Sequence, residues 1–170
     1  MDFLELAKKR YSCRSISDKP VEDEKIEKIL KAGMLAPTAV NFQPFKIWVV
    51  KSKEGVEKIG EITTCTFGAP LFFVVGGLEE SAWNRRFDGK NFAEIDASIV
   101  ATQMMLEIHD LGLGSTWVGH FDPVKLRELF PQMKGYEIVA LFPIGYPADD
   151  AKPSDRHEAS KSVEELVEVL

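Results

Sequence analysis

Cysteine and histidine are scarce in this sequence, and their scarcity excludes two kinds of small protein. The chain of 170 residues has two cysteines, Cys13 and Cys65, too few for the disulfide framework of a small secreted domain. Its three histidines, His109, His120 and His157, stand at no spacing typical of a zinc site. We therefore predict no metal site and a protein of a reducing compartment.

Long apolar runs and an excess of basic charge are absent as well. The first ten residues, MDFLELAKKR, lack the apolar stretch and small-residue cleavage site of a secretory signal. The longest nearly apolar run, residues 68–78, is far shorter than the roughly 20 residues of a membrane helix. The formal net charge of −6 disfavours unspecific binding to nucleic acid or an anionic membrane. The sequence thus predicts a soluble cytoplasmic protein without nucleic-acid or membrane partners.

No internal repeat or flexible linker divides the chain, so we predict a single domain over residues 1–170. Hydrophobic spacing predicts its elements. The predicted helices cover residues 2–9, 22–36, 52–61, 92–111 and 124–130, and the predicted strands cover residues 45–50, 70–75, 116–121 and 138–144. The tail, residues 163–170, suits either a helix or a sheet edge. Alternation of helices and strands alone favours an α/β fold with a sheet covered on both faces.

Two arginines and two serines lie within residues 10–15, RYSCRS, where the first predicted helix ends. A guanidinium group offers a planar fork of donors that matches phosphate oxygens, and each charge-assisted hydrogen bond contributes about 1.5–3 kcal/mol. The segment therefore predicts a phosphate-binding site. The alternative is a helix C-terminus whose basic residues complement the helix dipole.

The loop at residues 36–44, APTAVNFQP, carries a hydroxyl and two carboxamides between a predicted helix and a predicted strand. Side-chain amides both donate and accept hydrogen bonds, so they can recognise a ring edge on which carbonyl and N–H groups alternate. Ordinary turn formation is the alternative, because Asn and Pro are common in turns.

A glycine-rich stretch, GLGSTWVGH at residues 112–120, follows the long predicted helix. Glycine lets the backbone approach a ligand closely, but a dinucleotide-binding fingerprint has strand, glycines and helix in that order, which is not the order here. We therefore reject a Rossmann interpretation. The alternative to a ligand-contacting stretch is a helix C-cap at Gly112 followed by a buried strand.

Arg156 stands among acidic residues after the GYP turn at residues 145–147, with Asp149, Asp150 and Asp155 close in sequence. Taken alone, this arginine predicts a surface ion pair of little energetic weight.

Together and in this order, the four segments resemble the nitroreductase family of FMN-dependent NAD(P)H oxidoreductases. The resemblance extends from Phe3 to about Arg156, and its most specific parts are the RxSxR pattern of residues 10–14 and the loop at residues 36–44. It implies an α+β fold with a central mixed, mainly antiparallel sheet flanked by helices, and a homodimer with FMN at the subunit interface. The long helix at residues 92–111, apolar on several faces, would then belong to that interface.

By similarity, residues of all four segments would contact FMN. Arg10, Ser12 and Arg14 would hold the phosphate and ribityl chain together with Arg156. The loop would approach the flavin from the partner chain, and residues 117–120 would pass beside the flavin ring. The full set of implied cofactor-binding residues is Arg10, Tyr11, Ser12, Arg14, Pro37, Thr38, Ala39, Asn41, Gln43, Trp117, Val118, Gly119, His120 and Arg156.

The activity implied by the resemblance is ping-pong transfer of a hydride from NAD(P)H to FMN and then of electrons to an oxidised acceptor such as a nitroaromatic or quinone. The cofactor carries this chemistry, so we assign no catalytic side chain. Two alternatives are an FMN-binding protein without turnover and a specialised flavin reaction, dehalogenation or dehydrogenation, on the same scaffold. A third makes Cys13 a redox thiol activated by Arg10 and Arg14.

Three features depart from the larger members of the family. Ser154 replaces a basic residue two positions before Arg156, Gly119 replaces an acidic residue beside the flavin, and the chain is too short for the long insertion that shapes their substrate pocket. These differences leave the acceptor and the choice between NADH and NADPH open. Trp83 is expected to pack in the core or interface, with a lid formed by residues 83–86, WNRR, as the alternative, and His157 is expected in a polar turn, where it packs or contacts solvent.

Overall fold

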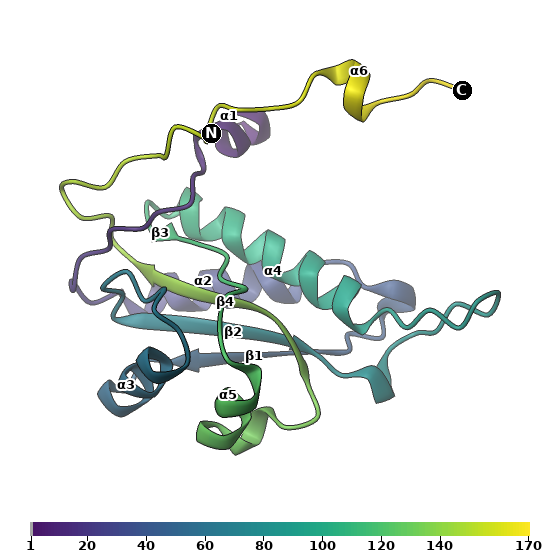
Figure 1. The fold of residues 1–170 in the computed structure, drawn as a ribbon, viewed down its shortest axis with the longest axis horizontal. Coiled ribbons are helices and arrows are strands. Elements are labelled where there is room, and N and C mark those ends of the chain that lie inside the picture. The colour runs from purple at the N-terminus through teal and green to yellow at the C-terminus, as the bar shows by residue number, and fades with distance from the viewer. Residues whose placement is uncertain (1) are drawn as a thin grey trace.

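A computed structural model describes residues 2–170 and has one antiparallel sheet at its centre (Figure 1). Within these residues the four strands of the sheet adjoin in the order β1-β2-β4-β3. Their bounds are Phe45–Val50 for β1, Leu71–Gly77 for β2, Gly114–Ser115 for β3 and Glu137–Gly145 for β4. Each neighbouring pair runs antiparallel.

The helices flank this sheet. Their bounds are Phe3–Lys9 for α1, Asp23–Met34 for α2, Lys53–Ile62 for α3, Ala93–Asp110 for α4, Pro123–Leu129 for α5 and Val163–Leu166 for α6, with short 3-10 turns at Ala39–Asn41, Glu79–Ser81 and Pro131–Met133. The α/β prediction drawn from alternation is wrong, because α3 joins β1 to β2 as antiparallel neighbours, so a helix between two strands does not require a parallel crossover. The α+β fold implied by the resemblance is confirmed.

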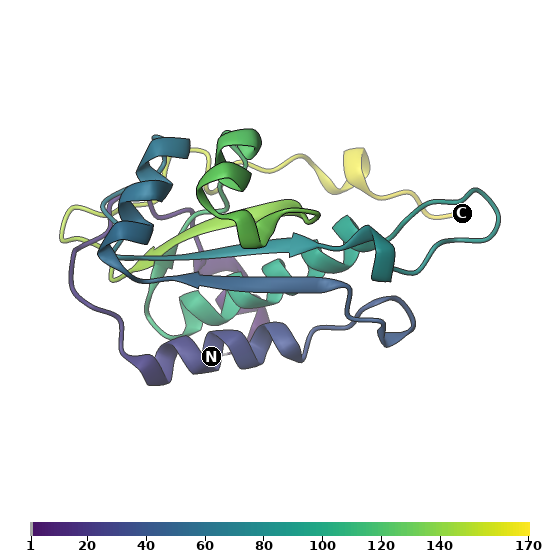
Figure 2. The same cartoon turned by 90° about the horizontal axis from the view of Figure 1, so that it is seen from below.

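Both faces of the sheet are buried. Every residue of β2 is buried, and successive side chains of a strand point to opposite faces. Leu71, Phe73 and Val75 belong to the core that α2 and α4 cover, while Phe72 and Val74 belong to the core under α3 and α5. Figure 2 shows the two layers of helices on opposite sides of the strands. The prediction of a sheet covered on both faces is confirmed.

The strand predicted at residues 116–121 is wrong, and a proline explains why. β3 ends at Ser115, which pairs with Ile144 of β4. In the same register, Val118 forms an isolated bridge with Leu141, which places Thr116 opposite Pro143. Proline has no backbone N–H to donate to Thr116, so the ladder between β3 and β4 is interrupted there. The other predicted elements agree with the structure to within about two residues, as boundary assignments allow.

Helix α4 dominates one layer and ends as predicted. Gly112 adopts a positive φ of 75° and donates its N–H to the carbonyl of His109, while Leu113 donates to Ile108, the pattern of a Schellman cap. Residues 2–170 leave part of the α4 surface uncovered, since Ile95 remains 37% exposed. Within residues 2–170 no helix, α4 included, combines the length and hydrophobicity needed to cross a membrane.

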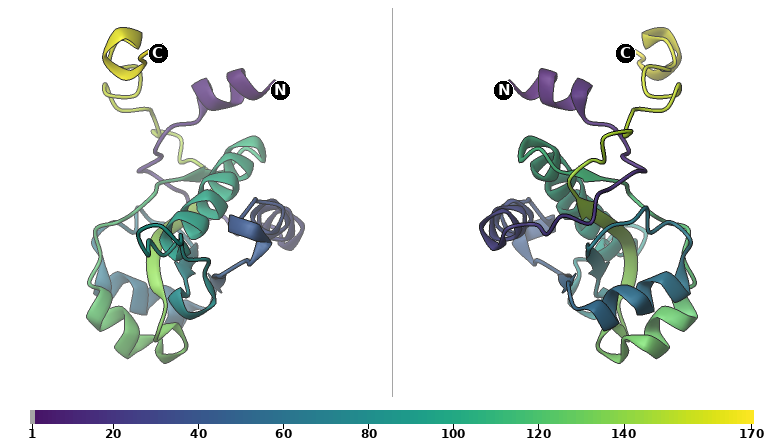
Figure 3. Two further views of the ribbon diagram at one scale, coloured as in Figure 1. Left: turned by 90° about the vertical axis from the view of Figure 1, so that its right-hand side faces the viewer. Right: turned by 90° about the vertical axis from the view of Figure 1, so that its left-hand side faces the viewer.

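The two ends of the chain stand away from the sheet. Figure 3 shows α1 and α6 standing outside the layered body, apart from each other. Helix α1 buries none of its residues, and the tail, for which helix and strand were both predicted, has one helical turn followed by extended, exposed residues as far as Leu170.

Candidate functional site

Two arginines of one short segment and a third that is distant in sequence meet in one cavity of about 240 Å³ beyond the end of α1. We call Arg10, Arg14 and Arg156 the arginine clamp. The cavity is lined by Arg10, Tyr11, Ser12, Arg14, Ser154, Arg156 and His157. This site therefore brings together four residues of the predicted phosphate segment and the distant Arg156.

The course of the chain after β4 explains how Arg156 reaches this cavity. The backbone N–H of Ser17 donates to the carbonyl of Tyr146 at 2.8 Å, and that of Ala148 donates to the carbonyl of Ser15 at 3.1 Å. The hydroxyl of Ser15 then donates to the carboxylate of Asp150 at 2.7 Å. These bonds align the segment after β4 with the segment after α1, and the two stay close beside α1 in Figure 3. Residues 154–157 thereby return to residues 10–14.

The other side of residues 10–14 is fixed by β3. The N–H of Cys13 donates to the carbonyl of Ser115 at 2.9 Å, and the hydroxyl of Thr116 donates to the carbonyl of Cys13 at 2.6 Å. Cys13 is fully buried, and a side chain at Gly114 would place its Cβ only 2.7 Å from the Cys13 sulfur. Cys13 is therefore a packing residue under the clamp, and its burial disfavours the alternative of a reactive redox thiol.

The clamp is electrostatically uncompensated. Within residues 2–170 none of the three arginines forms an ion pair, so the surface ion pair expected for Arg156 is not found. Burial lowers the pKa of His109 on α4, and the positive charge of Arg10 lowers it further. Burial, followed by the neighbouring Cys13, raises the pKa of Tyr11. A cavity with three unpaired guanidinium groups is suited to an anion.

The loop at residues 37–43 forms a strained, internally bonded turn. The Thr38 hydroxyl accepts the N–H of Gln43 at 3.0 Å, and the Gln43 amide donates to the Asn41 side-chain oxygen at 3.2 Å. Val40, Asn41 and Gln43 all have positive φ, at 46°, 57° and 53°. Such conformations are costly for residues other than glycine, and they are typical of functional sites. The turn formation expected as the alternative is thus present, and the exposed side chains remain available to a ligand.

A buried carboxylate supports this loop from α4. Asp96 is 1% exposed, and one of its oxygens accepts the N–H of Ala39 at 2.9 Å. Its other oxygen has no hydrogen-bond donor among the residues that the structure describes. This role was not predictable from the sequence, because an aspartate in the first turn of a helix is typical of a solvated dipole partner.

The loop and the clamp lie at opposite ends of α4. Asp96, beneath the loop, and His109, beside the clamp, are separated by about 20 Å along the helix at 1.5 Å rise per residue. Accordingly no residue of the loop lines the clamp cavity. One chain does not unite the two groups of predicted cofactor residues.

Residues 117–120 have mainly packing contacts in the single chain. The Trp117 indole N–H donates to the carbonyl of Val139 at 3.0 Å, and its ring packs edge to face on Phe142. Val118 is buried against β4, whereas Gly119 and His120 are exposed. Of the four residues, the last two are therefore free to contact a ligand.

Two cavity residues were not among the predicted set. Ser154 was noted only as a departure from the family, and His157 was expected in a polar turn with a packing or solvent-contact role. The rings of His157 and Tyr11 lie edge to face, with their centres 6.3 Å apart. The nearness of His157 to Arg156 was the available signal, and it had no weight until the turn was known to fold back on residues 10–14.

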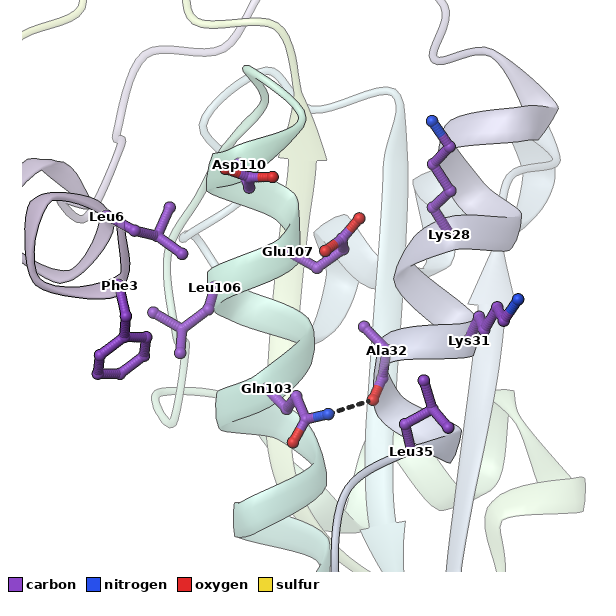
Figure 4. A pocket seen from close by; sticks show the side chains of 10 residues that line it. All are labelled: Phe3, Leu6, Lys28, Lys31, Ala32, Leu35, Gln103, Leu106, Glu107 and Asp110. Atoms are coloured by element: carbon purple, nitrogen blue, oxygen red, sulfur yellow. Dashed lines mark hydrogen bonds between the residues drawn. The ribbon is translucent and has the colours of Figure 1, made fainter. Parts of the chain in front are cut away.

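A larger cavity of about 600 Å³ lies between α1, α2 and α4 (Figure 4). Leu6 and Leu106 face each other across it, and Gln103 bridges α4 to α2 by donating to the carbonyl of Ala32 at 3.0 Å. It has an apolar floor and a mixed charged rim, with Lys28 and Glu107 on opposite helices. Such a lining does not favour an anion, and we do not assign the cofactor to it.

Residues 79–92 form an arm between β2 and α4. The arm projects away from the sheet, as Figures 1 and 2 show. Trp83 packs edge to face on Phe92 at its base, Arg85 pairs with Asp88, and Phe87 is 98% exposed at its far end. The expected packing role of Trp83 is confirmed, while a lid function of the arm stays a prediction.

Comparison with known proteins decides the family. The sequence profile of the nitroreductase family matches residues 7–67 and 65–146. A nitroreductase family protein from Clostridium difficile 630 is 41% identical, with a TM-score of 0.91, and the match covers 99% of this chain and 98% of that protein. This chain belongs to the nitroreductase family.

Other family members extend the comparison. A protein of Methanothermobacter thermautotrophicus with the provisional name NADH dehydrogenase/NAD(P)H nitroreductase is 34% identical over 165 residues, which span 91% of this chain and 82% of that protein. A provisionally named nitroreductase from Desulfovibrio desulfuricans, solved in complex with FMN, is 25% identical with a TM-score of 0.78, and the match covers 96% and 94% of the two chains. The resemblance found in the sequence is therefore confirmed as family membership.

Proposed function

We propose that residues 1–170 form one FMN-binding domain of an NAD(P)H-dependent oxidoreductase that acts as a homodimer. The provisional name of the archaeal relative and the FMN held by the Desulfovibrio protein support this assignment. We also propose a cytoplasmic location, where free thiols such as those of Cys13 and Cys65 persist.

The observation that carries the proposal is the arginine clamp. A phosphomonoester carries nearly two negative charges at neutral pH, and unpaired guanidinium groups are the side chains best suited to bind it. Arg10, Arg14 and Arg156 share a cavity with the hydroxyl-bearing residues Ser12 and Ser154. In a chain of net charge −6, this concentration of positive charge fits the phosphate of FMN.

The size of the cavity supports a site completed by a second copy. Complete ligand pockets usually have about 300–1,000 Å³, so the 240 Å³ clamp cavity suits the phosphate end of FMN alone. The loop at residues 37–43 lies at the other end of α4, and a two-fold partner could bring its own loop to this clamp. We propose that Pro37, Thr38, Ala39, Asn41 and Gln43 act across the interface and that residues 117–120 lie beside the ring.

Exposed apolar side chains support the same dimer. Monomeric proteins rarely expose large contiguous apolar patches, and α4 presents Ile95 and Ile99 at 37% and 38% exposure. Phe3 and Leu4 of α1 are 65% and 67% exposed on a helix that buries nothing. We propose that this surface of α1 and α4 meets a second copy of the chain.

When bound, FMN would supply the redox chemistry, accepting a hydride from NAD(P)H and passing electrons to an acceptor such as a nitroaromatic or quinone. The residues of this chain bind and orient. The clamp fixes the phosphate, and the strained loop presents Asn41 and Gln43 as amide partners for a ring edge. No side chain is assigned a proton transfer, and we propose ping-pong exchange through one cleft.

An absorption experiment tests the proposal. The purified protein should bind FMN, and NADH or NADPH should bleach its visible absorption under anaerobic conditions. Added quinone or nitroaromatic should restore the colour, and initial-rate plots at several acceptor concentrations should be parallel. FMN that binds but is bleached by neither nicotinamide would favour a binding protein without turnover. Absence of FMN binding would contradict the proposal itself.

A further inference from the structure

His157 is a residue of the clamp cavity to which the proposed function assigns no role. It lines the cavity together with Arg14 and Arg156, although it follows Arg156 directly in the chain. Neighbours in an extended segment point in opposite directions, so a turn is needed to bring both into one cavity. That turn is closed by the N–H of His157, which donates to the carbonyl of Ser154 at 2.9 Å.

The ring of His157 is held in place. It lies edge to face with Tyr11 at a centre-to-centre distance of 6.3 Å, and it is half-buried while Arg156 is exposed. Aromatic pairs in this geometry are stabilising, so the imidazole does not need to be ordered by a ligand. The histidine therefore packs at the wall of the clamp cavity through its own contact with Tyr11.

Its charged surroundings come from three parts of the chain. Arg10, Tyr11, Arg14 and Arg156 line the same cavity, His109 on α4 interacts with it electrostatically, and Asp155 and Glu158 are its neighbours in sequence. A dianion bound in the cavity favours the charged form of an imidazole beside it. Protonation and anion binding are then thermodynamically linked.

We propose that His157 is a fourth, pH-dependent member of the phosphate site, whose imidazolium form donates to the phosphate of FMN beside the arginine clamp. The proposal rests on the proposed function, since it takes the phosphate of FMN as the ligand. It also accounts for the uncharged Ser154. The positive charge absent at that position is supplied by His157, three residues later. FMN is accordingly held more tightly at acidic than at alkaline pH, relative to a protein without the histidine.

The test compares FMN dissociation constants at about pH 6 and about pH 8.5, on either side of the ordinary histidine range. The phosphate of free FMN itself titrates near pH 6, and because the free ligand is the same for every variant, each variant is compared with the wild type at the same pH. His157→Phe keeps an aromatic ring against Tyr11 and removes the charge. His157→Lys keeps a positive charge at both pH values. His109→Gln removes a nearby histidine that does not line the cavity.

At pH 6, His157→Phe should weaken FMN binding about tenfold, the effect of one charge-assisted hydrogen bond at a partly exposed site. At pH 8.5 the same variant should bind within about twofold of the wild type. His157→Lys should match the wild type at pH 6 and bind more tightly at pH 8.5, and His109→Gln should follow the wild type at both. Thermal melts of each variant confirm that it is folded.

Equal effects of His157→Phe at the two pH values, or failure of lysine to restore affinity at pH 6, would overturn the inference while leaving the proposed function intact. Wild-type protein that fails to bind FMN at both pH values would instead contradict the proposed function.

Discussion

Asp96 and Ala39 join the longest helix to the strained loop, through a hydrogen bond of 2.9 Å from the Ala39 N–H to the Asp96 carboxylate. The acceptor is buried and the loop that it holds has three residues of positive φ. An isolated loop would not keep such a conformation, so α4 supplies the support that the loop itself lacks.

Asp96→Ala should therefore lower the free energy of unfolding by about 1–3 kcal/mol, because the N–H of Ala39 loses its acceptor. Asp96→Asn retains an acceptor oxygen and should cost less. Glu94→Ala, an exposed residue of the same turn, should stay within about 0.5 kcal/mol of the wild type. Urea denaturation measures all three. If the asparagine variant loses as much as the alanine variant, the charge of Asp96 and not its acceptor oxygen is what the fold requires.

Arg156→Ala should weaken FMN binding at least about tenfold without lowering stability, because a charge-assisted hydrogen bond to the phosphate contributes about 1.5–3 kcal/mol. Lys152→Ala is the matched control, since Lys152 is exposed on the same segment but does not line the cavity. Fluorescence titration with FMN measures both. Similar losses for the two variants would mean that general positive charge, and not the clamp geometry, attracts the cofactor.

Two glycine substitutions should have opposite effects on stability. A Cβ at Gly77 of β2 would overlap the backbone carbonyl of Ala93, so Gly77→Ala should destabilise the protein by about 1–3 kcal/mol. Nothing lies within 4 Å of a Cβ at Gly60, inside α3, so Gly60→Ala should stabilise it by roughly 0.5–1 kcal/mol. Denaturant midpoints distinguish these results. A neutral Gly77→Ala would show that β2 and the start of α4 are not as closely packed as described.

Ile99→Arg should separate the two subunits, because it places a charge in the exposed apolar face of α4 that we assign to the interface. Val124→Arg makes the same chemical change on α5, in the opposite layer, where the side chain is 66% exposed. Light scattering after gel filtration should show a dimer for the wild type and for Val124→Arg, and a monomer with weakened FMN binding for Ile99→Arg. A dimeric Ile99→Arg variant would place the interface elsewhere.

Stability should depend on pH through His109. Burial lowers its folded pKa, so below the ordinary histidine value near 6.5 the unfolded chain binds more protons than the folded protein. The stabilisation that comes from keeping His109 neutral in the folded protein is complete above that pH. It is lost as the pH falls toward the lowered pKa of the folded state. Glutamine does not titrate, so the melting temperature of His109→Gln should fall less than that of the wild type between about pH 7 and about pH 5.5. Parallel melting curves for variant and wild type would contradict this assignment.

Sequence patterns identified the elements well and their assembly less well. Helices such as α2 have an apolar period that persists in isolation, so their bounds were predictable. The strand at residues 116–121 was not, because its failure depends on Pro143, a residue of a different strand that meets Thr116 only in the folded sheet. Local β-propensity contains no information about the partner strand.

The candidate site, too, could be predicted only in part from the sequence. Arg10 and Arg14 were recognisable because they lie in one short segment, and Arg156 was joined to them by family resemblance alone. His157 was missed because it reaches the cavity through a turn closed on Ser154 and through backbone bonds between residues 15–17 and 146–148. Such contacts are tertiary, and no spacing in the sequence encodes them.

The difference in affinity between FMN and riboflavin is the most direct test of the arginine clamp, since the two ligands differ only by the phosphate. We predict that the wild-type protein binds FMN at least about a hundredfold more tightly than riboflavin, as two or more charge-assisted hydrogen bonds require, and that Arg14→Ala combined with Arg156→Ala removes most of this difference. Equal affinities of the wild-type protein for FMN and riboflavin would contradict the account.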